Sequence, residues 1–239
     1  MLSLQHKTYL EQMNWDLIKE KNLKVNNNPF VIKNFLECPT EYVDWNKVNS
    51  CLYRRDMNWE IISESGFKTN IPQVDSLWYG THQDPIFLHD KIRSGSGFII
   101  NQYGRFDSAV NQLLYTLEQN FYSASDIHVY GGLGSSKSFN IHCDETCNFI
   151  IQVDGTTPWV VYENSYSFIS SVDRYFPDKS EVTPELEVEL SPGDLLYIPA
   201  WKYHQAMPNG KRLSMSIAML QRYFNTPVVH RQHRLTICP

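Results

Sequence analysis

Two histidines and one aspartate are the residues of this sequence whose types and spacing could hold a metal ion. His142 and Asp144 stand two positions apart in the run Ile-His-Cys-Asp. Side chains two apart on a β-strand point to the same face, so this pair would offer a neutral nitrogen and an anionic oxygen to one centre. We predict that His204 supplies the third ligand. Two histidines and a carboxylate on one face form the facial triad that suits Fe(II) and leaves coordination positions open.

His204 is chosen because of the segment that precedes it. Residues 192–199 read Pro-Gly-Asp-Leu-Leu-Tyr-Ile-Pro, which predicts a turn, a strand and a rigid stop. In a jelly roll this order brings a late strand beside an early one. Cys143 lies between the first two ligands and is expected to point to the opposite face. His128 lies on a predicted strand and could face a cavity, but we interpret it as a surface or hydrogen-bonded histidine.

The elements that must position the triad are short strands joined by turns. Strands are predicted at residues 127–130, 149–153, 159–162, 186–190, 195–198 and 213–220. The dipeptide Asp154-Gly155 is typical of a hairpin, and it would pair the second of these strands with the third. Five or more short strands with Gly, Pro and Asn turns indicate a β-sandwich or a jelly roll.

The part of the chain before these strands is expected to be more helical. Helical spacing runs over residues 4–23, and residues 108–119 read as one amphipathic helix. Trp45 and Trp59 suggest further helices that pack on something larger. Residues 29–36 predict a compact strand that runs into a turn.

Several of these segments resemble the cupin-like JmjC hydroxylases, in particular the ribosomal-oxygenase branch. The matching segments read FIINQYGRF, IHVYGG, HCDETCNFIIQVDGTTPWVVY and ELSPGDLLYIPAWKYHQA, with Phe139 three residues before the first ligand histidine. The run PFVIKNFL near residue 30 looks like the first strand of that superfamily. Asn148-Phe149, with Gln152 and Gly155, also looks like the asparaginyl-hydroxylase version of the motif. The resemblance covers about residues 29–222.

The resemblance implies a mainly β fold, a double-stranded β-helix of the cupin and JmjC type with an N-terminal helical wrap. We expect residues 1–95 to be the helical and mixed segment that packs on the barrel, residues 96–222 to form the barrel, and residues 223–239 to be a C-terminal tail. The implied chemistry uses Fe(II), O₂ and 2-oxoglutarate to hydroxylate a side chain, with succinate and CO₂ as by-products.

The resemblance and strand alternation also suggest residues for the cavity. Tyr130 matches the strand tyrosine of the family and could hydrogen-bond the co-substrate, although a core position is an equal alternative. Asn148, four residues after Asp144, could hold a carboxylate or a metal-bound water. Phe139 would form an apolar wall, whereas Trp159 is expected in the core.

One departure from the family pattern affects the co-substrate. A Lys or Arg thirteen residues after the ligand aspartate usually pairs with the distal carboxylate of 2-oxoglutarate, but Thr157 stands there. A buried carboxylate without a cationic partner is costly. Arg212 and Ser214 could replace that cation, because they resemble the Arg-x-Ser element of another branch of these oxygenases. The alternative is that Arg212 is an exposed hairpin residue.

Three classes of function remain open at this point. The first is a 2-oxoglutarate oxygenase that acts on a protein or peptide side chain. Only nineteen residues follow Leu220, which leaves no room for the helices and winged-helix module of ribosomal oxygenases, so a small-molecule substrate resembling an amino acid is kept as an alternative. The second is a cupin enzyme that uses a metal without 2-oxoglutarate, and the third is a binding module without turnover. The loop over residues 163–183 is expected to cover the mouth of the cavity.

Composition narrows the partners and the location. The net charge is −5 with scattered basic residues, so neither nucleic acid nor an anionic membrane is an expected partner. Five unevenly spaced cysteines argue against a disulfide framework. The N-terminus lacks the pattern of a signal peptide, and we expect a soluble, cytoplasmic protein. The sequence does not indicate an oligomeric state.

Overall fold

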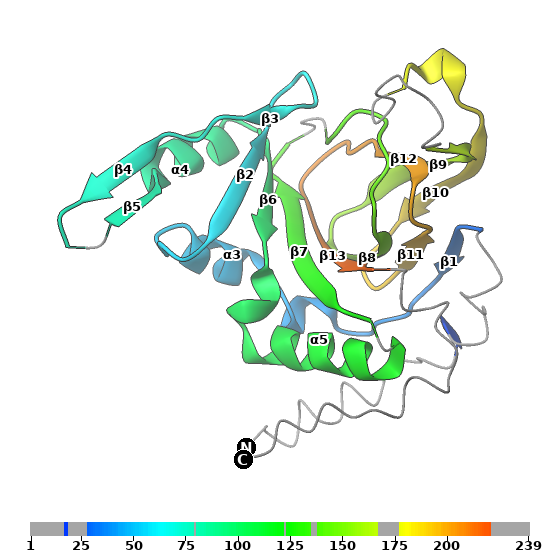
Figure 1. Ribbon diagram of the computed structural model, residues 1–239, viewed down its shortest axis with the longest axis horizontal. Coiled ribbons are helices and arrows are strands. Elements are labelled where there is room, and N and C mark those ends of the chain that lie inside the picture. Colours follow the sequence, from blue (N-terminus) through cyan, green and yellow to red (C-terminus); the bar gives the residue numbers. More distant parts are fainter. Residues whose placement is uncertain are drawn as a thin grey trace.

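Two facing sheets make up most of the computed structural model, which describes residues 17–18, 28–78, 80–121, 123–134, 138–166 and 177–220. Figure 1 shows them as the two sides of one barrel. The helix predicted over residues 4–23, apart from Leu17 and Ile18, lies outside the described residues. So do the central part of the 163–183 loop and the tail 223–239.

The main sheet has eight antiparallel strands in the order β1-β11-β8-β13-β7-β6-β2-β3. Their bounds are β1 Phe30–Ile32, β11 Leu195–Ile198, β8 Cys147–Asp154, β13 Arg212–Met219, β7 Ser125–Gly132, β6 Gly97–Asn101, β2 Asn58–Ile62 and β3 Lys68–Thr69. Strands that are far apart in the chain therefore lie side by side, with β13 between β7 and β8.

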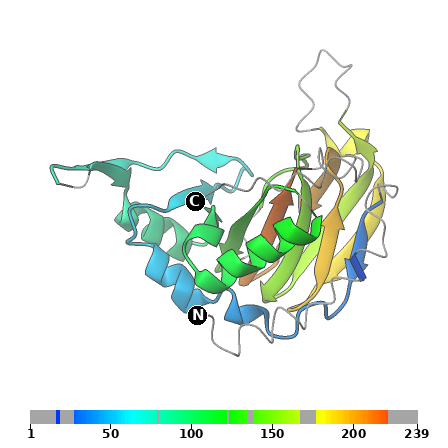
Figure 2. The same cartoon turned by 60° about the horizontal axis from the view of Figure 1, so that its bottom comes forward.

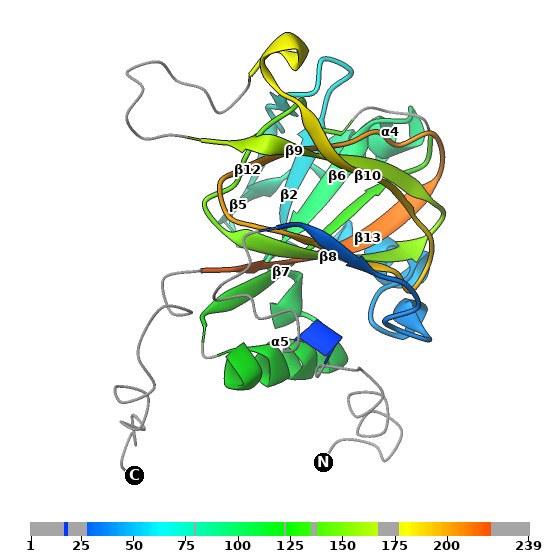
Figure 3. The same ribbon diagram turned by 90° about the vertical axis from the view of Figure 1, so that its right-hand side faces the viewer.

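A smaller sheet closes the other side of the barrel (Figure 3). It has three antiparallel strands in the order β10-β9-β12, which span Pro184–Leu190, Thr157–Ser165 and Lys202–Ala206. A separate hairpin, β4 Gln73–Ser76 with β5 Gly80–Gln83, projects away from the barrel (Figures 1 and 2). Short 3-10 turns occur at η1 Pro39–Glu41, η2 Tyr103–Arg105 and η3 Lys179–Glu181.

Between residues 28 and 220, the described helices that accompany the sheets are α3 Trp45–Cys51, α4 Pro85–Arg93 and α5 Ser108–Phe121. Helix α5 lies along the outer face of the main sheet (Figure 2). The Asp107 carboxylate starts it by accepting hydrogen bonds from the amides of Ala109 and Val110 at 2.8 and 3.2 Å. Its buried residues recur at helical spacing, as the sequence predicted: Ala109, Val110, Leu113, Leu117 and Phe121.

Strand β8 shows how the barrel divides its interior. Every residue from Cys147 to Val153 is buried, because one face of the strand packs in a core shared with α5, where Phe149 contacts Phe121, and the other face packs against the smaller sheet. Phe149, Ile151 and Val153 point into the large core beneath the helices. Ile150 packs instead with residues of both sheets, on the face that looks into the barrel. Side chains on this inner face are therefore the ones that can line a cavity.

The hairpin predicted through Asp154-Gly155 is wrong. Strand β8 pairs with β11 and β13, whereas β9 pairs with β10 and β12 in the other sheet. The turn is instead a corner at which the chain crosses between sheets. Gly155 has a φ of +65°, and a Cβ there would collide with the carbonyl oxygen of Lys211. This close approach, rather than a hairpin, is why a glycine is needed.

The region before residue 95 contributes strands as well as helices. Strands β1, β2 and β3 belong to the main sheet, and α3 and α4 lie outside it (Figure 1). Trp59 was expected in a helix but lies in β2, where its ring packs against Phe98 at 5.5 Å between centroids. Trp45 lies in α3, as expected. The fold class is the predicted one, a jelly-roll barrel with helices packed on its outside.

No helix within the described ranges is both long and apolar enough to cross a lipid bilayer.

Candidate metal centre

A single β-bridge brings the two triad histidines together. The His204 amide donates to the His142 carbonyl at 2.8 Å, and the His142 amide donates to the His204 carbonyl at 3.2 Å. His204 lies in β12, as the preceding turn and strand predicted. His142 and Asp144 do not lie in the regular strand that the spacing suggested. A third backbone hydrogen bond holds this segment next to the start of β12: the Trp201 amide donates to the Asp144 carbonyl at 2.7 Å.

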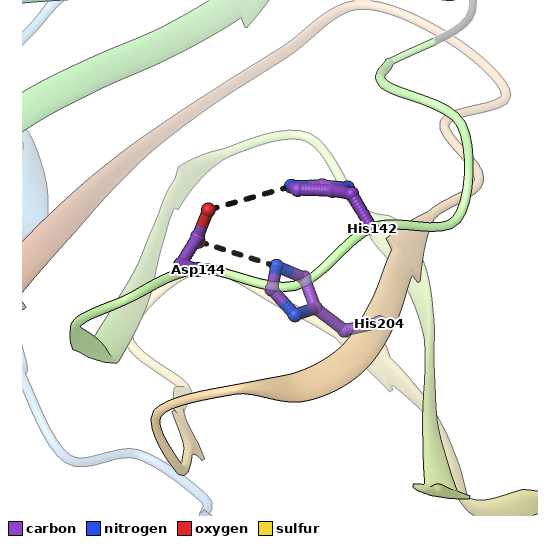
Figure 4. Close-up of side chains that lie close together, drawn as sticks. All are labelled: His142, Asp144 and His204. Carbon is purple, nitrogen blue, oxygen red and sulfur yellow. Dashed lines mark ion pairs between the residues drawn. The ribbon is translucent and has the colours of Figure 1, made fainter. Parts of the chain in front are cut away.

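The three predicted ligands converge on one point (Figure 4). Their ligand atoms all lie within 4.8 Å of one another. The Asp144 carboxylate places Oδ1 3.9 Å from His142 Nε2 and Oδ2 3.5 Å from His204 Nε2. Two ring nitrogens and one carboxylate at this spacing could hold a metal ion on one side and leave its other positions open.

Backbone carbonyls fix which ring nitrogen of each histidine faces the centre. His142 Nδ1 donates to the Asn140 carbonyl at 2.8 Å, and His204 Nδ1 donates to the Lys202 carbonyl at 2.9 Å. Since a carbonyl can only accept, Nδ1 carries a hydrogen in both rings, and in the neutral form of either ring Nε2 keeps its lone pair. Histidines that bind metals are commonly oriented in this way.

The charges at the centre also favour metal binding. Burial, reinforced by His204, lowers the pKa of His142 to about 4, so this ring is neutral near pH 7. Burial alone would raise the pKa of Asp144, but His204, His142 and the Asn148 amide together hold it below its usual value. The site therefore presents a neutral His142 ring and an ionised Asp144 carboxylate, the protonation states that metal ligands need.

Asn148 and Phe139 support the triad from two sides. Asn148 is buried, and its Nδ2 donates to Asp144 Oδ2 at 2.7 Å. We expected its amide to hold a carboxylate or a water, and the carboxylate that it contacts is that of the aspartate itself. The Phe139 ring packs edge-on against His142 at 5.3 Å, as an apolar wall would. Cys143 packs with Ile141 in an apolar cluster separate from the three ligand atoms.

A cavity of about 650 Å³, counted out to its open mouth, lies between the sheets beside the triad. The residues predicted for the co-substrate all line it: Tyr130, Phe139, Asn148, Arg212 and Ser214. Tyr130 and Ser214 are direct partners across strands β7 and β13. Burial raises the pKa of Tyr130, so its hydroxyl keeps its proton and can donate.

Arg212 is the buried cation of this cavity. It is only 7% exposed, which excludes the alternative that it is a surface residue of a hairpin. Its guanidinium donates to the Gly134 carbonyl at 3.2 Å, and no carboxylate of the described residues pairs with it. Burial lowers its pKa from 12.5 to about 10, so it remains charged at neutral pH. A buried charge without a counter-ion is costly, and an anionic ligand would relieve that cost.

Thr157 and Trp159 explain how the cavity can accommodate Arg212. Thr157, at the position where the family usually carries a cation, is buried and lines the same cavity. Its short side chain cannot replace the charge, but it leaves space beside the arginine. Trp159 was expected in the core but lines the cavity, with its ring 6.2 Å from that of His204. Ser216 also lines it, and extending the alternation beyond Ser214 would have predicted this.

The JmjC domain family matches residues 101–226, which is more than half of the chain. The chain belongs to the JmjC-domain family. Within the family it is 30% identical to zebrafish (Danio rerio) ribosomal oxygenase 1 over 145 residues, which cover 58% of this chain and 26% of that protein. It is also 30% identical over 118 residues to the bifunctional lysine-specific demethylase and histidyl-hydroxylase NO66 of Aedes aegypti, covering 47% of this chain and 19% of that one.

Solved JmjC relatives confirm the fold. The ribosomal oxygenase YcfD from Escherichia coli, in complex with cobalt and 2-oxoglutarate, superposes with a TM-score of 0.64. The match covers 95% of this chain and 60% of that one at 15% identity. This JmjC-domain protein thus spans about a quarter or less of its two curated relatives named above, and the activity of those larger proteins does not transfer to it without a test.

Proposed function

We propose that this JmjC-domain protein is an Fe(II)- and 2-oxoglutarate-dependent oxygenase that hydroxylates a side chain of a protein or peptide. The observation that carries the proposal is the buried Arg212, which lies in the same cavity as the triad and pairs with no carboxylate of the described residues. His142, Asp144 and His204 would hold the iron. When iron and the co-substrate are bound, they supply the oxidation that turns a C–H bond into C–OH, while 2-oxoglutarate and O₂ become succinate and CO₂.

The residues of the chain have four tasks in this reaction. Arg212 would pair with the distal carboxylate of 2-oxoglutarate, because its guanidinium can donate two parallel hydrogen bonds to it. Ser214 and Tyr130 offer hydroxyl donors on the neighbouring inner face. Asn148 orients the Asp144 carboxylate, and the Phe139 and Trp159 rings help to exclude water.

Succinate release and inhibitor binding test the co-substrate. The purified chain with Fe(II) and 2-oxoglutarate should form succinate, and N-oxalylglycine with metal should raise the melting temperature. His204→Ala should abolish both effects, whereas His89→Ala, an exposed histidine of α4, should preserve them. A wild-type chain that binds iron but shows neither effect would contradict the proposal. It would support the alternative that Thr157 suggests, a cupin enzyme that uses metal without 2-oxoglutarate.

The substrate class is the part of the proposal that rests most on the relatives. Their names describe ribosomal oxygenases and a histidyl-hydroxylase, which favours a protein side chain over a free amino acid. Incubation with ribosomal proteins and histones, followed by mass spectrometry, should find a residue that gains one oxygen atom. Oxidation of free amino acids alone would support the small-molecule alternative instead.

We also propose that residues 96–222 form the barrel domain and that the protein is cytoplasmic. The expected barrel at 96–222 is supported by the JmjC match, which begins at residue 101. The cytoplasmic location is supported by the free thiols of Cys38, Cys51 and Cys147.

A further inference from the structure

A second hollow adjoins the Arg212 cavity at the triad. It measures about 720 Å³ with its open mouth included, and four residues line both spaces: His142, Asp144, Tyr130 and Phe139. Its remaining polar lining comes from the β2, β3, β6 and β7 edge of the main sheet. A group bound there would therefore lie against the ligands His142 and Asp144 without occupying the Arg212 cavity.

A chain of hydrogen bonds crosses the floor of this hollow. The ammonium of Lys68 donates to Glu60 Oε1 at 2.8 Å, and Asn101 Nδ2 donates to the same oxygen at 3.1 Å. Asn101 Oδ1 lies 2.9 Å from His128 Nδ1. The four residues come from β3, β2, β6 and β7, so the network links four neighbouring strands.

The network fixes the proton on His128. A carboxylate can only accept, so Asn101 must turn its NH₂ group toward Glu60 and its carbonyl oxygen toward the histidine. His128 Nδ1 must then carry the hydrogen, which leaves Nε2 with a lone pair when the ring is neutral. Burial lowers the pKa of His128, so the ring is neutral near pH 7 despite the opposing effect of nearby carboxylates.

Two acceptors in the hollow are still free to bind a ligand. His128 Nε2 has no hydrogen-bond partner in the described part of the chain, and both contacts of Glu60 fall on Oε1, which leaves Oε2. Glu60 is largely shielded, with 22% of its side chain exposed, while Lys68 is 60% exposed. Lys68 and Asn101 keep N–H groups that these bonds do not use, whereas His128 Nε2 and Glu60 Oε2 are the network's unused acceptors.

We propose that this hollow binds the side chain to be hydroxylated and selects one that carries an N–H donor, with His128 Nε2 and Glu60 Oε2 as the acceptors. Asn101 is a positioning residue, because it acts through the tautomer of His128. The inference rests on the proposed oxygenase function for its purpose, but the binding preference itself needs no turnover. A side chain without a donor would leave both acceptors desolvated and unpaired, which is the basis of the discrimination.

Capped tripeptides test the preference. N-acetyl-Ala-X-Ala-amide peptides, with X as His, Arg, Lys or Asn, are compared with X as Leu, Met or Phe by titration of the full chain, loaded with Fe(II) and N-oxalylglycine without oxygen. At least one donor peptide should bind ten-fold or more tightly than every donor-free peptide. His128→Phe should remove that preference, and His89→Phe, a matched exchange at an exposed site, should retain it.

The tautomer of His128 distinguishes a positioning role of Asn101 from a purely structural one. Long-range proton–nitrogen correlation spectra of the full chain should show His128 protonated on Nδ1, and Asn101→Leu should shift the proton to Nε2 and lose the peptide preference. Equal binding of both peptide groups, no donor peptide that binds, or a wild-type Nε2–H tautomer would overturn the inference. Succinate formation by the wild type is scored separately, so a failed oxygenase assay with an intact peptide preference would refute only the function.

Discussion

Replacing Arg212 by methionine should separate the stability of the fold from the binding of an anion. Methionine keeps a long, flexible side chain of similar reach, but it removes the buried charge. The wild-type guanidinium has one carbonyl contact, to Gly134, and no carboxylate partner among the described residues. The variant therefore loses a group that the protein without its ligand does not need.

The expected change in stability follows from the pKa. Lowering the pKa of Arg212 from 12.5 to about 10 corresponds to about 3 kcal/mol of unfavourable burial, at about 1.4 kcal/mol for each pH unit. The lost hydrogen bond to the carbonyl offsets about 1.5–3 kcal/mol of that gain. Arg212→Met should therefore unfold with a free energy between unchanged and about 2 kcal/mol higher than the wild type.

Anion binding should change in the opposite direction. A charge-assisted pair with the guanidinium contributes about 3 kcal/mol, so N-oxalylglycine affinity should fall by about a hundred-fold. Urea unfolding of the metal-free protein gives the first quantity, and titration with N-oxalylglycine in the presence of metal gives the second. Lys211→Met is the matched control, because this neighbouring lysine is 55% exposed and pairs with Asp154 at 3.3 Å.

Two results would refute this reasoning. If Arg212→Met is less stable than the wild type by more than about 1 kcal/mol, the arginine has a structural role that its single hydrogen bond does not explain. If N-oxalylglycine binds the variant as well as it binds the wild type, another group holds the carboxylate. The same loss of affinity in Lys211→Met would show a general effect of net charge.

Three further outcomes are expected. Asn148→Leu removes the amide that orients the ligand carboxylate, so iron affinity measured by competition with a chelator should fall ten- to a hundred-fold, and unchanged affinity would contradict that role. Gly155→Ala should lower the free energy of unfolding in urea by about 3 kcal/mol. The control Gly80→Ala should lower it by about 1 kcal/mol, because Gly80 has a similar φ of +67° but open space around it. Equal losses would show that the collision with the Lys211 carbonyl is unimportant. N-oxalylglycine affinity should stay level from about pH 7 to pH 9 and fall above the Arg212 pKa of about 10, where the guanidinium loses its charge, whereas a fall below pH 8 would point to a different cation.

The triad could be predicted from the sequence because each ligand is marked by residues close to it in the chain. The spacing of His142 and Asp144 survives the absence of a regular strand, since one bridge and one further hydrogen bond hold the same extended geometry. His204 followed from a turn and a strand whose order has few solutions in a jelly roll. The burial of Arg212 was not predictable in this way. The alternation of side chains along a strand predicts which face of the sheet a residue lies on, but it does not predict whether other elements cover that face.

The errors in the sequence reasoning have one physical origin, which is contact between distant segments. Asp154-Gly155 has the composition of a hairpin turn, and only the carbonyl of Lys211 pressed against Gly155 shows that the turn is a corner. Trp59 precedes Ile61 and Ile62, residue types that favour a strand, and its place in β2 is fixed by pairing with β6. The network of Glu60, Asn101 and His128 was missed for the same reason, since each member lies on a different strand.

The bridge between His142 and His204 also bears on how long the protein would survive in a cell. A metal ion held by these residues would join two points about sixty residues apart along the chain, and would thereby close a long loop that includes β8, β9, β10 and β11. At a hundred-fold excess over its dissociation constant, such an ion adds about 2.7 kcal/mol to the stability of the folded state. When iron is scarce, the protein would therefore lose stability as well as activity. A larger fraction of the chain would be unfolded, and proteases would degrade it faster.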